Sequence, residues 1–133
     1  MIIRKARITD FAECVAISDI PEFSTKVDKE YLKGFLEKGI LIVAEENKRL
    51  VGFIAGEFML GDFVWVDAIT VKKEFRGKGI GKRLFGRFKE ELAKRGIKHT
   101  YLMAPKFNKN TLAFYRSLGM KEGKEFVEFS EDL

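Results

Sequence analysis

Three glycines and several basic residues lie close together in the stretch EFRGKGIGKRL, residues 74–84. An apolar run precedes the stretch at 63–71, and an amphipathic run with helical spacing follows it at 84–92. A strand that turns directly into a helix leaves the first helical amides without partners, and the peptide dipoles add about half a positive charge there. Glycines at alternate positions from 77 to 81 let these amides face one anion. The stretch therefore predicts a phosphate site, with a tight turn that binds nothing as the alternative.

The spacing of these residues excludes two familiar phosphate-binding loops. A Walker loop needs a Gly six residues before its Lys and a Ser or Thr after it, but Arg76 and Arg83 hold those positions around Lys82. The dinucleotide pattern G-x-G-x-x-G fails because its third glycine falls on Lys82 or on Leu84. The loop therefore indicates neither nucleotide triphosphate nor dinucleotide chemistry.

The positive charge of the chain is concentrated around this loop. The net charge is +5, whereas residues 72–95 carry ten Lys or Arg against three Glu, a local charge of +7. A basic stripe of this kind could track the phosphates of a nucleic acid, or it could be a solvated helix face. Phe85 and Phe88 lie at core spacing and so cannot serve as exposed stacking platforms, which argues against a nucleic-acid-binding module.

Composition limits the class of protein. A chain of 133 residues with 46% hydrophobic and 34% charged residues is typical of one soluble globular domain, here 1–133, and its richness in Lys, Arg and Glu fits a heat-adapted source. The longest apolar run is too short to cross a membrane, and charge follows Met1 too soon for a signal sequence, so we expect a cytoplasmic protein. Cys14 and His99 are the only residues of their types, which excludes an internal disulfide and argues against a metal site.

The elements that must hold the loop follow from hydrophobic spacing and capping residues. The expected order is β-α-α-β-β-β-α-β-α-β, with Thr9 and Asp28 as N-caps of the first two helices and Pro21 ending the first. The strands are predicted at 2–7, 40–45, 50–58, 63–71, 98–104 and 124–130, and the later helices before Gly96 and at 108–118. A strand, helix and strand near the middle should form a parallel crossover, while the hairpins are antiparallel. We therefore expect an α/β fold with one mixed sheet and helices on both faces.

Arg76, Gly79 and Gly81 form the pattern Arg-x-x-Gly-x-Gly directly after the strand that ends in AITV. This pattern resembles the signature [QR]-x-x-G-x-[GA] of the GNAT superfamily of N-acetyltransferases, which wraps the pyrophosphate of coenzyme A. The order of elements is similar to that family's over nearly the whole chain. The resemblance implies acetyl-CoA as the co-substrate.

A second stretch, NKNTLAFYRSLGM, resembles the family's other signature. Asn108, Tyr115 and Gly119 keep its spacing, while Thr111 and Met120 stand where the family often has Ala and Phe. Neither departure touches the chemistry. Two signatures in the right order are more specific for the family than one signature alone, so the chain is identified as a member.

The resemblance implies a binding residue set for coenzyme A. The backbone of Ile69 and Val71 would pair with the pantetheine arm as though it were an added strand. Asn108 would contact the same arm, with Asn110 as the alternative. The pyrophosphate would lie against the loop amides, which belong to Arg76, Gly77, Lys78, Gly79, Ile80, Gly81 and Lys82.

The resemblance also implies two candidate catalytic residues. Tyr115 would donate a hydrogen bond to the leaving thiolate, since a phenol of reference pKa about 10 is too weak an acid to protonate a thiolate of about 8.5 completely. The attacking ammonium, of reference pKa about 10.4, must lose a proton. Asp67 is the best-placed base if burial raises its pKa or a water relays the proton, and Glu57 is the second candidate. A purely structural role for Asp67 stays open.

The sequence thus predicts an enzyme that transfers an acyl group, most simply acetyl, from acyl-CoA directly to a primary amine. The acceptor could be a small molecule, a peptide or a protein. Direct transfer is expected because Cys14 has no histidine near it in sequence. The alternatives are a non-catalytic coenzyme A sensor and the nucleic-acid-binding module. The sequence leaves open the acceptor, the acyl length and the oligomeric state, a homodimer included.

Overall fold

A computed structural model describes residues 1–18 and 27–133, which divide into two compact units at 1–103 and 104–133. The first unit holds one sheet whose strand order follows the chain. Its strands are β1 (Ile2–Lys5), β2 (Gly39–Glu46), β3 (Arg49–Phe58), β4 (Phe63–Val71) and β5 (His99–Tyr101). Neighbouring strands are antiparallel except for the parallel pair β4 and β5. This confirms the predicted mixed sheet and its parallel crossover.

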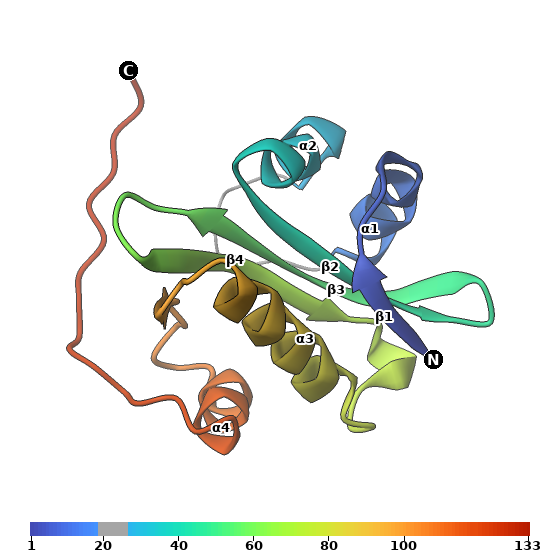
Figure 1. Ribbon diagram of the computed structural model, residues 1–133. Helices are drawn as coiled ribbons and strands as arrows, with labels where there is room; N and C mark the ends of the chain where they lie inside the picture. The colour runs from blue at the N-terminus through green and yellow to red at the C-terminus, as the bar shows by residue number, and fades with distance from the viewer. Residues whose placement is uncertain (19–26) are drawn as a thin grey trace. The chain divides into compact units, whose positions relative to one another are not determined.

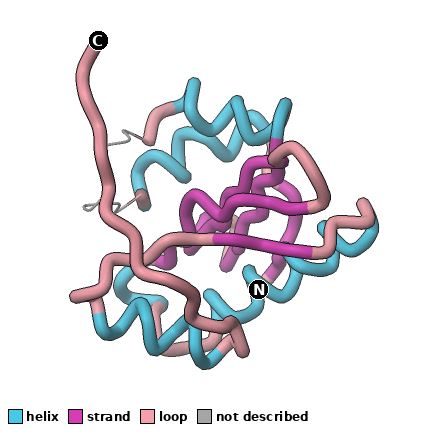
Figure 2. The backbone as a smooth tube through the Cα atoms, turned by 90° about the vertical axis from the view of Figure 1, so that its left-hand side faces the viewer, coloured by secondary structure: helices cyan, strands magenta, loops and turns pink. Residues whose placement is uncertain are grey.

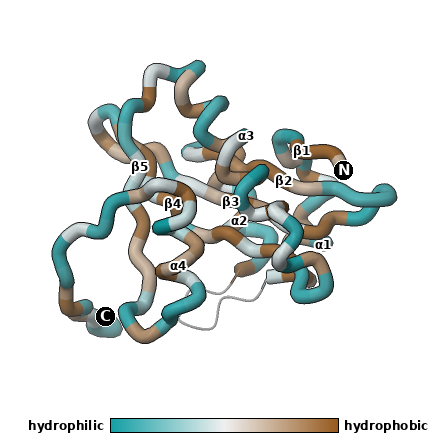
Figure 3. Tube along the Cα trace, turned by 90° about the horizontal axis from the view of Figure 1, so that it is seen from below, coloured by the Kyte–Doolittle hydropathy of each residue, from teal (hydrophilic) through white to brown (hydrophobic). Residues whose placement is uncertain are grey.

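Helices cover both faces of this sheet, as the sequence predicts. Helices α1 (Phe11–Ile17) and α2 (Lys29–Lys38) lie on one face, and α3 (Ile80–Lys94), the crossover helix between β4 and β5, lies on the other (Figures 1 and 2). The strands are largely hydrophobic along their length, whereas the loops between them carry hydrophilic segments (Figure 3). Burial of apolar side chains on both faces of the sheet is therefore the main source of stability for this unit.

Each face of the sheet has its own apolar layer. Cys14 from α1 and Leu32 and Phe35 from α2 pack in one cluster against the sheet. On the opposite face, Phe85 and Phe88 of α3 are buried, as their helical spacing predicts. Because these two rings belong to the core, they cannot stack on nucleic-acid bases.

The hairpin of β2 and β3 depends on its turn and on one close backbone approach. Asn47 and Lys48 take left-handed conformations, with φ of 50° and 64°, which suits a two-residue hairpin turn. Gly39, at the junction of α2 and β2, has extended φ, but a Cβ there would collide with the carbonyl of Gly56 on β3. Glycine is therefore required by the contact between strands and not by a left-handed helix end.

The start of α1 differs from the prediction. Thr9 lies inside a short 3₁₀ turn (Ile8–Asp10), and Asp10 is the residue that precedes α1. The Asp10 carboxylate accepts the backbone N–H of Arg7 at 2.7 Å and two hydrogen bonds from Arg4 at 2.8 and 2.9 Å. An ionised acceptor with a guanidinium partner binds these donors better than a hydroxyl, so Asp10 organises the turn. The predicted helix end at Pro21 lies outside the described residues.

The second unit contains α4 (Lys109–Ser117), which is the last helix predicted. Asn108 is its N-cap, and Gly119, with φ of 82°, follows its end. The predicted strand at 124–130 is wrong, because the unit has no strand after α4. A segment rich in β-forming residues becomes a strand only where another strand offers backbone partners, and within its own unit this segment has none. The prediction of one domain over 1–133 stays a prediction.

Candidate functional site

The short strand β5 pairs in parallel with only the first part of β4. The pairing runs from Phe63 opposite His99 to Trp65 opposite Tyr101, whereas β3 stays paired with β4 as far as Val71. In the described part of the chain, residues 66–71 of β4 therefore have a strand neighbour in the sheet on one side only. The other side of this segment is an open strand edge, which can accept an extended ligand as an additional strand.

Ile69 and Val71 present their backbone groups to this open edge. The next residue, Lys72, donates its N–H to the carbonyl of Val51 on β3, at 2.8 Å. Because successive residues of a strand point their backbone groups to alternate sides, those of Val71 and Ile69 point away from β3. The two residues predicted to pair with pantetheine thus lie where such pairing is possible.

The glycine-rich loop joins the end of β4 to the start of α3. Gly77 and Gly79 have left-handed φ of 77° and 80°, and Gly79 is the N-cap residue of α3, which begins at Ile80. A Cβ at Gly77 or Gly79 would meet no atom within 4 Å, so glycine is needed there for its conformation and the space beside it is open. The first amides of α3 have no helical acceptors. The loop therefore combines left-handed glycines with helix-start amides that lack helical acceptors, which is the type of backbone that can bind an anion.

The side chain of Arg76 contacts the strand that precedes the loop. Its Nε donates to the carbonyl of Val71 at 2.8 Å, which ties the loop to the end of β4. A carbonyl oxygen can accept two hydrogen bonds, so this contact is compatible with the predicted role of Val71. The sequence predicts Arg76 as a phosphate contact, and the structure adds this second role, which its spacing alone does not reveal.

Asp67 lies at an irregularity in the pairing of β3 and β4. The pairs Ala55–Ala68 and Gly56–Val66 leave Asp67 as an extra residue on β4, which is the pattern of a β-bulge. A bulge interrupts the alternation of side chains, so consecutive residues can face the same layer. Ala68 packs in the cluster with α1 and α2, and the Asp67 carboxylate also reaches α2.

The half-buried carboxyl of Asp67 has two polar neighbours from other elements. Burial, together with a hydrogen bond and charge repulsion from Glu57 of β3, raises the pKa of Asp67 to about 8. The hydroxyl of Tyr31 on α2 donates to Oδ2 at 3.3 Å and acts in the opposite direction. A carboxyl with such a pKa is a much stronger base than an exposed aspartate. The two carboxyl groups that the sequence names as alternative bases are thus brought together.

Tyr31 is the functional candidate that the sequence does not reveal. Its spacing places it on the apolar face of α2, and its ring does pack edge-on against Phe35, with centroids 4.9 Å apart. Nothing in the sequence connects its hydroxyl with Asp67, because the two residues are 36 positions apart. Only the sheet and helix packing bring them together.

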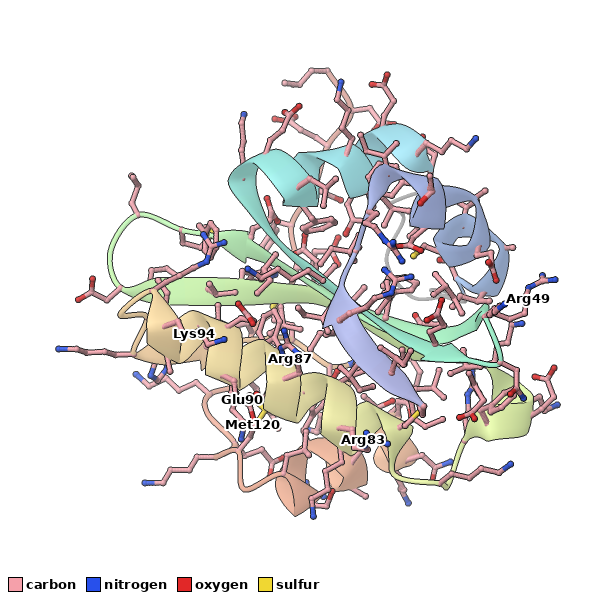
Figure 4. All side chains as sticks on the ribbon, turned by 45° about the vertical axis from the view of Figure 1, so that its right-hand side comes forward. Arg49, Arg83, Arg87, Glu90, Lys94 and Met120 are labelled. Carbon is pink, nitrogen blue, oxygen red and sulfur yellow. The ribbon has the colours of Figure 1, made fainter. Side chains whose placement is uncertain are left out.

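The basic face of α3 is partly neutralised within the first unit. Arg83, Arg87, Glu90 and Lys94 lie along this helix, and a shallow groove of about 420 Å³ opens beside the first three (Figure 4). Arg87 and Lys94 both contact the buried carboxylate of Glu91, at 3.1 and 3.3 Å. These ion pairs consume part of the local positive charge, which further weakens the nucleic-acid interpretation.

The second signature lies in the second unit. Asn108 caps α4, since its Oδ1 accepts the N–H of Thr111 at 3.1 Å, so this residue has a structural role beside any contact with pantetheine. Asn110 lies in the first turn of α4 and Tyr115 in its last turns. Desolvation raises the pKa of Tyr115 to about 12, so its hydroxyl keeps its proton at neutral pH and can donate a hydrogen bond.

Comparisons with a family model, with curated proteins and with solved structures give a consistent result. Residues 7–120 match the model of the acetyltransferase (GNAT) family. An uncharacterized N-acetyltransferase of Methanocaldococcus jannaschii is 34% identical over 92 residues, which cover 65% of this chain and 40% of that protein. The chain thus spans less than half the length of this curated relative.

Solved structures share the fold. A possible acetyltransferase from Clostridium difficile 630 is 28% identical, with a TM-score of 0.79, over 99% of this chain and 97% of that one. An aminoglycoside acetyltransferase from an uncultured soil metagenomic sample, solved in complex with sisomicin, has a TM-score of 0.82 at 20% identity, over 99% and 95% of the two chains. No helix in the described ranges combines the length and apolarity needed to cross a membrane.

Proposed function

The chain belongs to the GNAT acetyltransferase family, and from this premise we propose that it transfers an acetyl group from acetyl-CoA directly to a primary amine. The observation that carries the proposal is the meeting of two features in the first unit. The open edge of β4 leads through a short 3₁₀ turn (Lys73–Phe75) to the glycine-rich loop, and the loop leads into the N-terminus of α3. An extended arm that ends in a pyrophosphate fits this sequence of backbone donors.

The residues present fit coenzyme A at named positions. Ile69 and Val71 would hold the pantetheine arm through their backbone groups, and the amides from Arg76 to Lys82 would hold the pyrophosphate. The left-handed glycines at 77 and 79 support this assignment, because they give the loop a conformation that other residues rarely adopt and the space beside them is open. Asn108 would assist from the second signature. When bound, acetyl-CoA supplies the acyl group as an activated thioester.

Asp67 would accept the proton that the attacking ammonium must lose. Its raised pKa brings its basicity closer to that of the amine, and efficient proton transfer requires such a match. Glu57 holds this pKa up through its charge and hydrogen bond. The environment of Asp67 therefore supports it over an ordinary surface carboxylate as the base.

Tyr115 would stabilise the leaving thiolate through its protonated hydroxyl. Direct transfer is favoured because Cys14 is fully buried and burial raises the pKa of its thiol to about 12, which leaves no thiolate to form an acyl-enzyme. The acceptor is proposed only as a primary amine of a small molecule, peptide or protein. A cytoplasmic location is kept as part of the proposal.

Calorimetric titration with acetyl-CoA tests this function. Gly79→Glu should abolish binding in a folded protein, because it places bulk and negative charge at the phosphate position. Gly96→Glu is the matched control, since Gly96 has φ of 73°, equally open surroundings and a place just beyond the other end of α3. Equal acetyl-CoA affinity in folded Gly79→Glu and Gly96→Glu proteins would refute the proposed binding site.

A further inference from the structure

We propose that Tyr31 is a positioning residue for Asp67 in the proposed acetyl transfer, through the hydrogen bond from its hydroxyl to Oδ2 at 3.3 Å. The inference rests on the proposed function, which gives Asp67 the role of base. It adds a residue from α2 to the pair of carboxyl groups formed by Glu57 on β3 and Asp67 on β4. Tyr31 acts through Asp67 and is not assigned any contact with substrate.

The position of the Tyr31 hydroxyl is fixed by the start of α2. The backbone N–H of Tyr31 donates to Oδ1 of the N-cap residue Asp28 at 2.8 Å. The ring packs at 89° against Phe35, which is buried in the core one turn later. With both the backbone and the ring held, little rotamer entropy is lost when the hydroxyl bonds to Asp67. The carboxyl therefore meets a donor already in place.

Two titratable groups act on Asp67 from the elements packed against its strand in the described chain. Glu57 on β3 raises the pKa of Asp67, and the Tyr31 hydroxyl on α2 lowers it. Burial, the charge of Asp67 and the hydrogen bond between Tyr31 and Asp67 all raise the pKa of Tyr31. The phenol therefore stays protonated and remains a donor throughout the working pH range. Tyr31 thus counteracts Glu57 and keeps the ionised form of Asp67 accessible.

Removing the hydroxyl should therefore change when Asp67 ionises. In Tyr31→Phe, the acidic limb of kcat/KM should move upward by roughly half to one pH unit, the size of one lost neutral hydrogen bond. Activity should fall roughly three- to tenfold at pH 7 and stay close to wild type at pH 10. The same upward shift should appear in a ¹³C NMR titration of the Asp67 carboxyl, whose signal is identified by its loss in Asp67→Asn.

Two further variants distinguish a positioning role of Tyr31 from a general loss of structure. Tyr101→Phe removes a phenol hydroxyl from strand β5 of the same unit and should leave both titrations unchanged. In an Asp67→Asn background, Tyr31→Phe should cause no further loss of activity, because the residue through which it acts is gone. A uniform loss of activity at every pH would instead indicate a structural role for Tyr31 and would overturn the proposal.

The NMR titration needs no turnover, so it separates this inference from the proposed function. An Asp67 carboxyl that titrates at the same pH in Tyr31→Phe and wild type overturns the positioning role, whether or not the protein acetylates amines. A shifted titration in a protein that releases no thiol with any amine of a broad panel would support the contact and refute the proposed function.

Discussion

Two carboxyl groups of the first unit, on opposite sides of one sheet, have opposite surroundings. Asp67 lies on the side of α2 beside another carboxyl group, Glu57, and its pKa is raised to about 8. Glu91 lies on α3, and burial alone would raise its pKa as well. Its contacts with Lys5, Lys94 and Arg87, at 3.1–3.3 Å, outweigh burial and lower that pKa to about 2.

The comparison shows how burial and neighbouring charges together set the pKa of a carboxyl in this fold. Glu91 links α3 to β1 through Lys5, and its charge is fully compensated, so it resists protonation and gives no useful base. Among the described residues no cation forms an ion pair with Asp67, which therefore holds its proton up to a pH of about 8. A carboxyl whose pKa is raised in this way is a candidate for a functional role, and the proposed function assigns that role to Asp67.

The largest expected effect separates the two carboxyls by activity. Asp67→Asn should lower the rate of amine acetylation by roughly a hundredfold to ten-thousandfold, because it removes the proton acceptor. Glu91→Gln, per folded molecule, should turn over like wild type. Thiol release measured at pH 8 with an accepted amine compares them directly. Equal losses of acetylation rate in both variants would contradict the assignment of different roles to Asp67 and Glu91.

A second effect concerns the leaving group. Its pH dependence should differ from that of the Asp67→Asn substitution. Tyr115→Phe should slow turnover by roughly ten- to a thousandfold, the usual range for one donor to a developing anion. Affinity for acetyl-CoA should change little, since the ring is retained, and the acidic limb should keep its position. Wild-type turnover in this variant would leave only a structural role for the Tyr115 ring.

The next effect is a loss of stability at Glu91. Glu91→Gln should reduce the free energy of unfolding at pH 7 by about 1–3 kcal/mol, because three cationic partners lose a charged acceptor. A carboxyl whose pKa is lowered by folding stabilises the fold above its unfolded pKa, and this contribution disappears as pH falls toward 2. Urea unfolding should therefore show a large difference between variant and wild type at pH 7 and a small one near pH 2.5. An equal difference in stability between variant and wild type at both pH values would refute the ion-pair explanation.

The smallest effect has the opposite sign and lies at Asp67. A carboxyl whose pKa is raised by folding costs stability as pH rises from its unfolded value through its folded one, here from about 4 to about 8. Asp67→Asn should therefore raise the melting temperature by a few degrees at pH 9, and by about nothing at pH 4. Thermal melts across this range give the test, and a gain that is independent of pH would contradict it.

Local features of the fold and site could be predicted from the sequence. Asp28 caps α2 as expected, and Gly79 starts α3 with the left-handed backbone that only glycine adopts easily. These outcomes depend on neighbouring residues along the chain. The parallel crossover also follows, because the apolar periodicity identifies its two strands and the helix between them.

Features that depend on distant partners could not be predicted. The bulge that turns Asp67 toward α2 is set by its register against β3, and the Tyr31 contact depends on helix packing. The sequence therefore gives Asp67 as a candidate base but not its raised pKa. The segment at 124–130 shows the reverse failure, since its apolar residues are visible in the sequence but the strand partner it needs is not.

The pH dependence of kcat/KM for amine acetylation, in wild type and Asp67→Asn, tests the central claim most directly. The amine's own titration occurs in both proteins, so only a limb that the substitution removes belongs to the carboxyl. The account predicts a wild-type acidic limb near pH 8 that Asp67→Asn abolishes, together with a large loss of rate. An acidic limb that persists at the same pH in Asp67→Asn would show that Asp67 is not the base.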